Sequence, residues 1–447
     1  TYAQRRFQSS NTNPQICIVG SGPAGFGVAQ FILKNHPSAQ VDMFEKLPVP
    51  FGLIRYGVSP DHQDVKNCIN GYTKTASSNR FSFHGNVDVG KDVTLVQLCS
   101  NYHAVVLCHG AQEERRLGIN GQDSRNVFTS SQFVGWYNGN PSYQNVDIDL
   151  SGNTAVIIGV GNVALDCARM LLKPTKMLED TDITSSACNK LSTSNINRVH
   201  LVGRRGPMQM ACTRKELSEI TDLEGISKKL NYIFICNNCL TDLKRRKQQR
   251  LIKYLKKVAK VSPLSNSEKQ LFVEYLLTPH SVMSDDDGSV TGGDNVYDPD
   301  IIPTDETHHI PCQLVLSCIG NDNKPLDSRL VPFSSGKIDH IGGRVNAELG
   351  LYASGWCRDG AQGVLADSSN SSMETAATVL GDIEDLMQRK SNCNGHNSVF
   401  NFLNEKDIVS WKGWTTIDQH EINQGKKLGK IREKVLSVNE LIEISKT

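Results

Sequence analysis

The chain has 447 residues, of which 38% are hydrophobic and 21% are charged, and its formal net charge is +1. This length is enough for two or three domains with apolar cores, and the near-neutral charge excludes the global basic field typical of nucleic-acid-binding proteins. The 13 cysteines are widely scattered, which excludes a disulfide scaffold, and there is no run of about 18 apolar residues that would predict a membrane-spanning helix.

The first residues are basic and rich in serine. Arg5, Arg6, Ser9 and Ser10 come before any acidic residue, the first of which is Asp42. This composition is typical of a mitochondrial transit peptide, so we expect these residues to be the end of one. An artificially shortened chain is the alternative.

A glycine-rich loop follows the first apolar run. Residues 16–19 (ICIV) lead into residues 20–25 (GSGPAG) and then into a stretch with helical spacing. Gly20 permits a tight turn, Gly22 lets the backbone approach a pyrophosphate, and Gly25 lets the helix pack closely on the strand. The pattern predicts a dinucleotide site, with a purely structural glycine turn as the alternative.

The next strand indicates which nucleotide this first loop binds. Residues 41–44 (VDMF) end on Glu45, 25 positions after Gly20. An acid at this place accepts hydrogen bonds from ribose hydroxyls and repels a 2′-phosphate. We therefore expect FAD or NAD(H) here, and not NADP(H).

A second glycine loop repeats the pattern. Residues 155–158 (AVII) lead into residues 159–164 (GVGNVA), in which Gly159 and Gly161 have the spacing of the first two glycines and Ala164 takes the place of the third. An alanine is an accepted variant at that position. The chain is thus expected to bind two nucleotides.

Two arginines follow the strand that comes after this second loop. A polar segment, 173–196, precedes the strand 199–202 (VHLV), and Arg204 and Arg205 then stand where the ribose-binding acid would be. Arginine binds a phosphate bidentately and stacks on adenine. The second site is therefore predicted to select NADP(H), with two solvated loop arginines as the alternative.

The one close cysteine pair is Cys236 and Cys239. We interpret it as two incidental thiols, with a redox dithiol or half of a metal site as the alternative. No second close pair and no regular histidine spacing accompany it. The sequence therefore predicts no metal ion and no iron–sulfur cluster.

A strongly basic stretch lies farther along the chain. Residues 244–260 carry nine basic side chains and no acidic one, and apolar residues recur near one face of a helix. The stretch predicts an amphipathic helix with a basic outer face. A merely solvated face is one alternative, a membrane surface is another although exposed Trp or Phe is lacking, and nucleic acid is disfavoured because aromatic interleaving is missing.

Residues 50–62 (PFGLIRYGVSPDH) closely resemble a family-specific stretch of the adrenodoxin reductases, which are mitochondrial ferredoxin–NADP reductases. Further resemblances are found in residues 134–139 (VGWYNG), 161–166 (GNVALD), 202–207 (VGRRGP), 354–356 (SGW) and 429–434 (GKIREK). The region 226–310 resembles the family least, because it is shorter and more polar than expected.

The resemblance implies FAD in the first site and NADP(H) in the second. The residues expected at FAD are Gly20, Gly22, Ala24, Gly25, Glu45, Leu53, Val89, Trp356, Gly363, Val364 and Leu365. Those expected at NADP(H) are Gly159, Gly161, Asn162, Val163, Arg204, Arg205, Glu216 and Gly363. Many relatives in the wider flavoprotein class have Asp at the position of Trp356. The alternative interpretation of Trp356 is an aromatic side chain of the apolar core.

The expected fold is α/β, with two Rossmann-like dinucleotide-binding domains. The FAD domain is discontinuous, 1–112 and 321–447, and the NADP domain, 113–320, is inserted into it. Strands 104–107 and 314–317, which lead to Gly110 and Gly320, mark the crossing points.

The resemblance also implies the activity. The chain would pass a hydride from NADPH to FAD and then single electrons to an acidic 2Fe–2S ferredoxin, for cytochrome P450 or for iron–sulfur cluster assembly. We expect the ferredoxin to dock on Lys244, Arg245, Arg246, Lys247 and Arg250. The expected location is the mitochondrial matrix, with peripheral association at the inner membrane left open.

His62 and Asp166 lie in family-like motifs. We expect them to orient the two domains or to manage the flavin proton, with a structural hydrogen-bonded pair as the alternative. Three other functions remain open: a flavin disulfide reductase, a glutamate-synthase-type reductase subunit, and a non-enzymatic nucleotide-binding sensor. The first needs a redox cysteine pair beside the flavin and the second needs cluster-binding cysteines, and the sequence shows neither.

Overall fold

The computed structural model describes residues 13–111, 113–230, 246–259, 268–285, 290–295, 307–361, 365–403 and 406–447. The basic amino-terminal residues and the pair Cys236 and Cys239 lie outside this part of the chain. Within it, no helix is both long enough and apolar enough to cross a membrane.

The first unit is built on a six-stranded sheet with the order β18-β19-β4-β1-β2-β3. All neighbours in it are parallel except β18, which pairs antiparallel with β19 at one edge. Its strands are β1 (Gln15–Val19), β2 (Gln40–Glu45), β3 (Phe81–Gly85), β4 (Ala104–Leu107), β18 (Arg344–Asn346) and β19 (Leu351–Ala353). Strands from distant parts of the sequence therefore complete one sheet, as the prediction of a discontinuous unit requires.

Alternation along β1 explains how this sheet is covered on both faces. Ile16 and Ile18 belong to one apolar cluster, whereas Cys17 and Val19 belong to another. The first face packs on α1 (Pro23–Asn35) and α12 (Leu365–Arg389), and the second on α5 (Leu95–Asn101). Buried parallel strands of this kind need helices on both faces.

The second unit has a parallel sheet with the order β6-β14-β7-β8-β10-β9. Its strands are β6 (Val127–Thr129), β7 (Thr154–Ile158), β8 (Arg198–Gly203), β9 (Ile226–Leu230), β10 (Lys269–Tyr275) and β14 (Leu314–Ser317). Its helices are α6 (Ser130–Asn138), α7 (Asn162–Leu172), α8 (Ser185–Ser192), α9 (Arg214–Thr221) and α10 (Arg246–Ala259). All of these strands fall between β4 and β18 in the chain, so the predicted insertion of one α/β unit into another is confirmed.

The other described strands form three smaller sheets. They consist of β11 (Pro279–Ser284), β12 (Val290–Asn295) and β13 (His308–Pro311), of β5 (Glu113–Glu114) with β15 (Asn321–Asp322), and of β16 (Phe333–Ser334) with β17 (Lys337–Ile338). The β5–β15 pair is antiparallel and joins the two segments that cross between the units.

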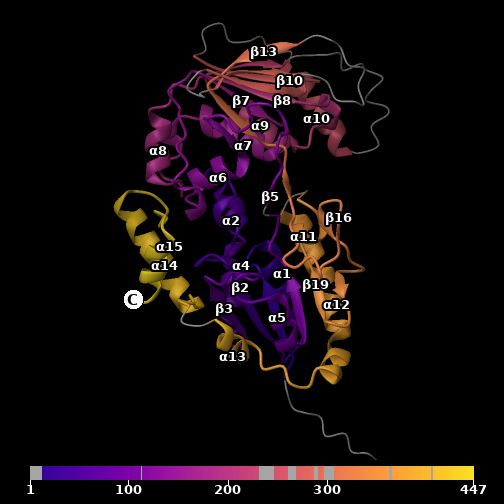
Figure 1. Ribbon diagram of the computed structural model, residues 1–447. Coiled ribbons are helices and arrows are strands. Elements are labelled where there is room, and N and C mark those ends of the chain that lie inside the picture. Colours follow the sequence, from indigo (N-terminus) through magenta and orange to yellow (C-terminus); the bar gives the residue numbers. More distant parts are fainter. Residues whose placement is uncertain are drawn as a thin grey trace, which may run out of the picture.

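The remaining helices connect or flank the two units. They are α2 (Leu53–Tyr56), α3 (Gln63–Lys66), α4 (Ile69–Ala76), α11 (Trp356–Asp359), α13 (His396–Val399), α14 (Trp411–Lys427) and α15 (Val438–Ser445), with 3-10 turns η1 (Pro141–Tyr143), η2 (Thr175–Met177), η3 (Pro207–Gln209) and η5 (Phe400–Phe402). In Figure 1 the yellow carboxyl-terminal helices α14 and α15 pass beside the indigo first unit toward the magenta second unit. The segment between these two helices reaches the second unit, where the Ile431 N–H donates to the Asp180 carbonyl oxygen, and α15 then returns to the first unit.

Candidate dinucleotide sites and the junction between them

The first glycine loop has one glycine with open space beside it. A Cβ on Gly20 (φ +102°) would lie 2.6 Å from the Cys108 carbonyl oxygen, and one on Gly25 would lie 2.0 Å from the Gly20 oxygen. A Cβ on Gly22 meets no atom within 4 Å. Gly20 and Gly25 are thus required by the loop itself, whereas Gly22 leaves room for a ligand.

Gly22 also caps the amino terminus of α1 without a side-chain hydrogen bond. The backbone N–H groups of a first helical turn lack partners within the helix and attract anions. Open space and these donors together fit the pyrophosphate of a dinucleotide.

Glu45, at the end of β2, is held against this loop. Its Oε2 accepts hydrogen bonds from the backbone N–H and the hydroxyl of Ser21, at 2.9 and 2.7 Å, and its Oε1 accepts from the N–H of Leu47 at 3.2 Å. The carboxylate is therefore fixed beside the glycine loop, as predicted for a ribose-binding acid, and its free lone pairs stay available to a ligand.

The family-like stretch 50–62 begins against the same loop. Phe51 has φ +82°, which is strained for a bulky residue, and its N–H donates to the Ser21 oxygen at 3.0 Å. A Cβ on Gly52 would lie 3.3 Å from Gly22 Cα. Leu53 follows, and its side chain is exposed.

A late segment of the chain returns to the start of α1. A Cβ on Gly355 (φ +70°) would lie 2.5 Å from Ala24 Cβ, and the Ser372 hydroxyl donates to the Ala24 oxygen at 3.1 Å. Trp356 comes directly after and is only half-buried, so it is not a core aromatic. The structure thus places Ala24 and the Trp356 segment together at the first loop.

Four other predicted FAD residues are placed less fully. Val89 is buried in the apolar cluster on the second face of the sheet. Gly363 and Val364 lie outside the described residues, and Leu365 is described only as the first residue of α12.

The second loop repeats the geometry of the first. A Cβ on Gly159 (φ +130°) would lie 2.4 Å from the Cys318 oxygen, whereas one on Gly161 has Ala211 Cβ as its nearest neighbour, at 4.0 Å. Asn162 begins α7, and its Oδ1 accepts from the Thr213 N–H at 3.1 Å. Val163 is exposed beside it. This loop also offers space at its middle glycine.

The charged residues predicted for NADP(H) surround this loop. Arg204 and Arg205 are exposed directly after β8, whose last residue, Gly203, packs against Val160. The Oε2 of Glu216, on α9, is buried and has no hydrogen-bond partner among the described residues. A buried acceptor without a donor and two exposed cations fit a nucleotide that carries an additional phosphate.

A cluster of charges joins the two units near these loops. Arg169, on α7, donates to Asp61 Oδ2 and Oδ1 at 2.8 and 3.0 Å, and Lys173 donates to the same Oδ2 at 2.8 Å. Burial opposes ionisation of Asp61, but these hydrogen bonds hold its pKa well below the usual value. No motif in the sequence indicated this cluster, apart from the position of Asp61 next to His62.

His62 and Asp166 belong to this cluster but do not hydrogen-bond each other within the described residues. His62 Nε2 lies 2.7 Å from Glu219 Oε2, and Asp166 Oδ1 accepts from Arg169 at 2.7 Å. Arg169 also approaches Glu219, at 3.7 Å. Burial raises the pKa of Asp166 above its usual value. The alternative prediction, a direct hydrogen bond between His62 and Asp166, is wrong, because each residue has a charged partner of its own.

A second cluster at the junction involves the carboxyl-terminal segment. Asp182 accepts hydrogen bonds from Lys66 Nζ at 2.7 Å and from Gln63 at 2.6 Å, and Lys434 Nζ lies 2.9 Å from it. Burial lowers the pKa of Lys434 to about 7, against the opposing effect of Asp182. No motif in the sequence indicated these contacts.

The basic stretch forms α10 as predicted. Leu251, Tyr254 and Leu255 are buried, whereas Arg250, Lys253 and Lys257 are exposed. The amphipathic helix is thus confirmed over its described residues. Of the predicted docking residues, Lys244 and Arg245 lie outside the described part, as do the side chains of Arg246 and Lys247.

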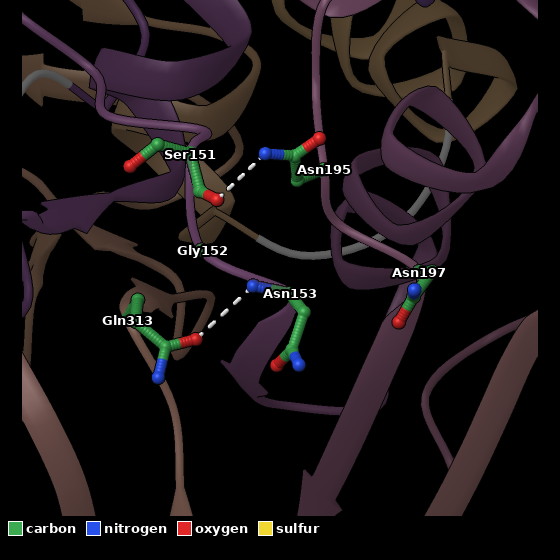
Figure 2. A pocket seen from close by; sticks show the side chains of 6 residues that line it. All are labelled: Ser151, Gly152, Asn153, Asn195, Asn197 and Gln313. Atoms are coloured by element: carbon green, nitrogen blue, oxygen red, sulfur yellow. Dashed lines mark hydrogen bonds between the residues drawn. The ribbon is translucent and has the colours of Figure 1, made fainter.

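Figure 2 shows a polar hollow of about 540 Å³ at the opposite end of the second sheet. It is lined by Ser151, Gly152, Asn153, Asn195, Asn197 and Gln313, at the amino ends of β7 and β8. Two lining pairs hydrogen-bond each other, Asn195 to Ser151 at 3.0 Å and Asn153 to Gln313 at 3.2 Å. Ligands of parallel sheets bind at the carboxyl ends of the strands, so this hollow is not the nucleotide site.

Comparisons with known proteins agree with this geometry. A family model described as pyridine nucleotide-disulphide oxidoreductase matches residues 14–257. The mitochondrial NADPH:adrenodoxin oxidoreductase of Salvelinus fontinalis is 42% identical over 458 residues, with 97% of this chain and 92% of that protein covered. The protein of the same name from Homo sapiens is 41% identical, with 98% and 93% covered.

A solved structure shows the same agreement in three dimensions. Mycobacterium tuberculosis FprA, in complex with NADPH, has a TM-score of 0.89 and 33% identity, with 98% of this chain and 100% of that chain covered. The resemblance seen in the sequence is confirmed over nearly the whole chain. The chain therefore belongs to the adrenodoxin reductase family of flavoprotein oxidoreductases.

Proposed function

We propose that this chain carries electrons from NADPH through FAD to a 2Fe–2S ferredoxin. The family determines the reaction class, so the protein is an NADPH-dependent oxidoreductase with FAD and NADP(H) as cofactors. The observation that carries the proposal is the contrast between the two loops, since the strand after the first ends on Glu45 and the strand after the second is followed by Arg204 and Arg205. That contrast supports NADP(H) at the second loop, and the FAD cofactor of the family is then left for the first.

When bound, FAD accepts two electrons from NADPH and can release them singly to an iron–sulfur protein. The chain binds and orients the cofactors. The open position at Gly22 and the first turn of α1 hold the pyrophosphate of FAD, and Glu45 binds its ribose. Leu53 and Trp356 extend this site from the two segments that pack on the loop.

In the second site Gly161 and the amino terminus of α7 hold the NADP(H) pyrophosphate. Arg204 and Arg205 bind the 2′-phosphate, and the unpaired Oε2 of Glu216 accepts a hydrogen bond from the nucleotide. An NADH molecule lacks the phosphate and gains nothing from the two arginines, which is the basis of the proposed selectivity.

We assign His62 and Asp166 to positioning, because both act on the charge cluster that joins the units. In a His62→Gln variant the pH profile of kcat/KM should keep its shape, while the thermal midpoint should fall. Loss of one limb of the profile would instead assign the proton-transfer role to His62.

The ferredoxin is proposed to dock on the basic face of α10. The adrenodoxin named for the relatives is the model for this partner. Arg250, Lys253 and Lys257 are exposed on the helix, and an acidic surface would be steered toward them. The predicted neighbours Lys244, Arg245, Arg246 and Lys247 extend the same basic run.

The relatives are named mitochondrial, and we place this chain in the mitochondrial matrix or on the matrix side of the inner membrane. We also propose the domain boundaries 1–112 with 321–447 for FAD, and 113–320 for NADP(H). The division of the strands between the two sheets supports these boundaries.

The thiols near the first loop do not support a disulfide reductase activity. The nearby thiols of Cys108 and Cys357 are buried, and burial raises the pKa of Cys357 to about 12. A thiol with so high a pKa does not form the thiolate that disulfide exchange needs.

An absorption spectrum tests the proposed function. The purified protein should show bound flavin that bleaches with NADPH and regains its colour when an oxidised 2Fe–2S ferredoxin is added. NADH at the same concentration should bleach it far more slowly. A preparation without flavin, or one that the ferredoxin does not reoxidise, contradicts the proposal.

A further inference from the structure

Asp42, His84 and His396 meet on the face of the first sheet opposite α1. Asp42 lies on β2, His84 lies on β3, and His396 is the first residue of α13. One oxygen or nitrogen from each lies within 4.8 Å of the others. His396 Nδ1 is 3.0 Å from Asp42 Oδ1, and His84 Nε2 is 3.4 Å from the same oxygen. Two imidazoles and a carboxylate thus converge on one point.

The distances from Asp42 Oδ1 to the two imidazole nitrogens are close to those between zinc ligands. In a tetrahedral Zn²⁺ site the metal–ligand bonds are about 2.0–2.1 Å long, so neighbouring ligand atoms lie about 3.3 Å apart. The two distances from Asp42 Oδ1, 3.0 and 3.4 Å, lie on either side of this value. Histidine nitrogen and carboxylate oxygen are also donors that Zn²⁺ prefers.

Other groups hold the carboxylate in an orientation suited to a metal. Asp42 Oδ2 accepts hydrogen bonds from the Tyr102 hydroxyl at 2.7 Å and from the His396 N–H at 3.0 Å. Neither of these two donors occupies Oδ1, which lies near both imidazoles, although His396 Nδ1 is also 3.0 Å from Oδ2. Supporting hydrogen bonds of this kind orient ligating carboxylates in metalloproteins.

Two members of the cluster are buried, and the third is partly exposed to solvent. Asp42 is 3% exposed and His84 is 6% exposed, whereas the His396 side chain is 33% exposed. The rings of Phe44 and Phe400 pack on His84 at centroid distances of 4.9 and 5.1 Å. An ion can therefore enter from the His396 side, where a water molecule would complete four-coordination.

We propose that Asp42, His84 and His396 bind one Zn²⁺ ion. The ion would fasten the segment that begins α13 to strands β2 and β3, far along the chain from both of them. Its role is structural, because the ligands lie on the face of the sheet away from α1 and take no part in either glycine loop. The proposal is independent of which electron acceptor the protein uses.

The test uses the flavin-loaded protein, stripped with a chelator and then titrated with ZnCl₂. We expect one Zn²⁺ per chain by elemental analysis and a rise in the thermal midpoint on zinc addition. His84→Gln and His396→Gln should each weaken binding at least about tenfold. His280→Gln, on exposed β11, is the matched control and should bind as the parent does.

Co²⁺ provides a readout that a hydrogen-bonded cluster cannot give. Bound Co²⁺ should develop visible absorption bands of a four-coordinate site in the parent protein, and these should disappear in His396→Gln. The His396 side chain is partly exposed, so His396→Gln should fold even if His84→Gln does not, and it alone can then test the proposal. Zinc binding that survives both substitutions, or no stoichiometric binding by the parent, overturns the proposal. Binding that is lost only with Cys236→Ser or Cys239→Ser overturns it equally.

Discussion

Arg169 donates two hydrogen bonds to Asp61 through Nε and Nη2, at 2.8 and 3.0 Å. Arg169 belongs to the second α/β unit, whereas Asp61 lies in the chain of the first, in the segment 50–62 that begins against the first glycine loop. The arginine side chain is 1% exposed and that of the aspartate is 7% exposed. A buried ion pair therefore joins the two units.

Removing the charge of Asp61 should destabilise the junction strongly. Asp61→Asn leaves Arg169 and Lys173 without their shared partner, and breaking a buried pair costs about 3–5 kcal/mol. Urea unfolding at neutral pH measures this loss. Asp123→Asn removes an exposed partner of Arg116, with side chains 76% and 65% exposed, and should cost less than about 1 kcal/mol. Equal losses for the two variants would contradict the role of Asp61.

The same pair predicts a dependence on pH. The pKa of Asp61 is lower in the folded chain than in the unfolded chain. Its stabilising contribution is therefore complete above the unfolded value of about 3.9 and is lost as the pH falls toward the folded value. The free energy of unfolding of the parent should decline more steeply below about pH 5 than that of Asp61→Asn. Parallel declines would show that other carboxylates cause the acid sensitivity.

Gly22→Ala should remove FAD without unfolding the chain. Gly22 has φ −77°, which alanine adopts readily, and the added Cβ meets no protein atom within 4 Å. It would instead occupy the space assigned to the pyrophosphate. The ratio of flavin to protein absorbance should fall several-fold while the circular dichroism spectrum stays the same. Gly71→Ala, with an equally open Cβ position on α4, should keep its flavin. Full flavin content in Gly22→Ala would refute the site.

Changing Arg204 and Arg205 to Ala should lower the affinity for NADPH much more than for NADH. Each charge-assisted hydrogen bond contributes about 1.5–3 kcal/mol, so a loss of at least about 100-fold in NADPH binding is expected for the double variant. The flavin reduction rate as a function of NADPH and NADH concentration gives both affinities. Arg198→Ala, exposed at the amino end of the same strand, is the control. The same loss for both nucleotides would mean that the arginines do not read the 2′-phosphate.

Reversing charges on α10 should slow the reaction with the ferredoxin alone. Arg250→Glu with Lys253→Glu should weaken ferredoxin-dependent cytochrome c reduction and flatten its salt dependence, because steering by opposite charges is screened by salt. Direct reduction of ferricyanide by the enzyme should be unchanged. Lys412→Glu, exposed on α14 on the other side of the molecule in Figure 1, should leave both rates intact. If Lys412→Glu has the same effect, α10 is not the docking surface.

Local patterns were sufficient to locate both nucleotide loops. The strands before Gly20 and Gly159, the helices after them, and the strands that end at Glu45 and Gly203 were all predicted, and the structure has them within a residue or two. The amphipathic face of α10 was predicted equally well. In these cases the residues belong to one continuous strand–helix–strand segment, so spacing along the chain carries the information.

The contacts between segments that are distant along the chain were not predicted from local patterns. A hydrogen bond between His62 and Asp166 was the alternative prediction, but His62 pairs with Glu219, because α9 and α7 present their charged side chains to the same edge of the junction. The buried Lys434 and its partner Asp182 were not predicted at all. Such pairs depend on how whole elements pack, and no local spacing records that.

The sequence by itself predicted two dinucleotide sites and a different nucleotide for each, because each glycine loop and the residues after its next strand belong to one strand–helix–strand pattern. Only the tertiary structure decided how the two sites are joined, through Asp61 with Arg169 and through Asp182 with Lys434. It alone brought Asp42, His84 and His396 together, where the sequence had predicted no metal site. The physical reason is the same in each case, since charge pairing and metal ligation depend on distance in space, and folding sets that distance independently of separation along the chain.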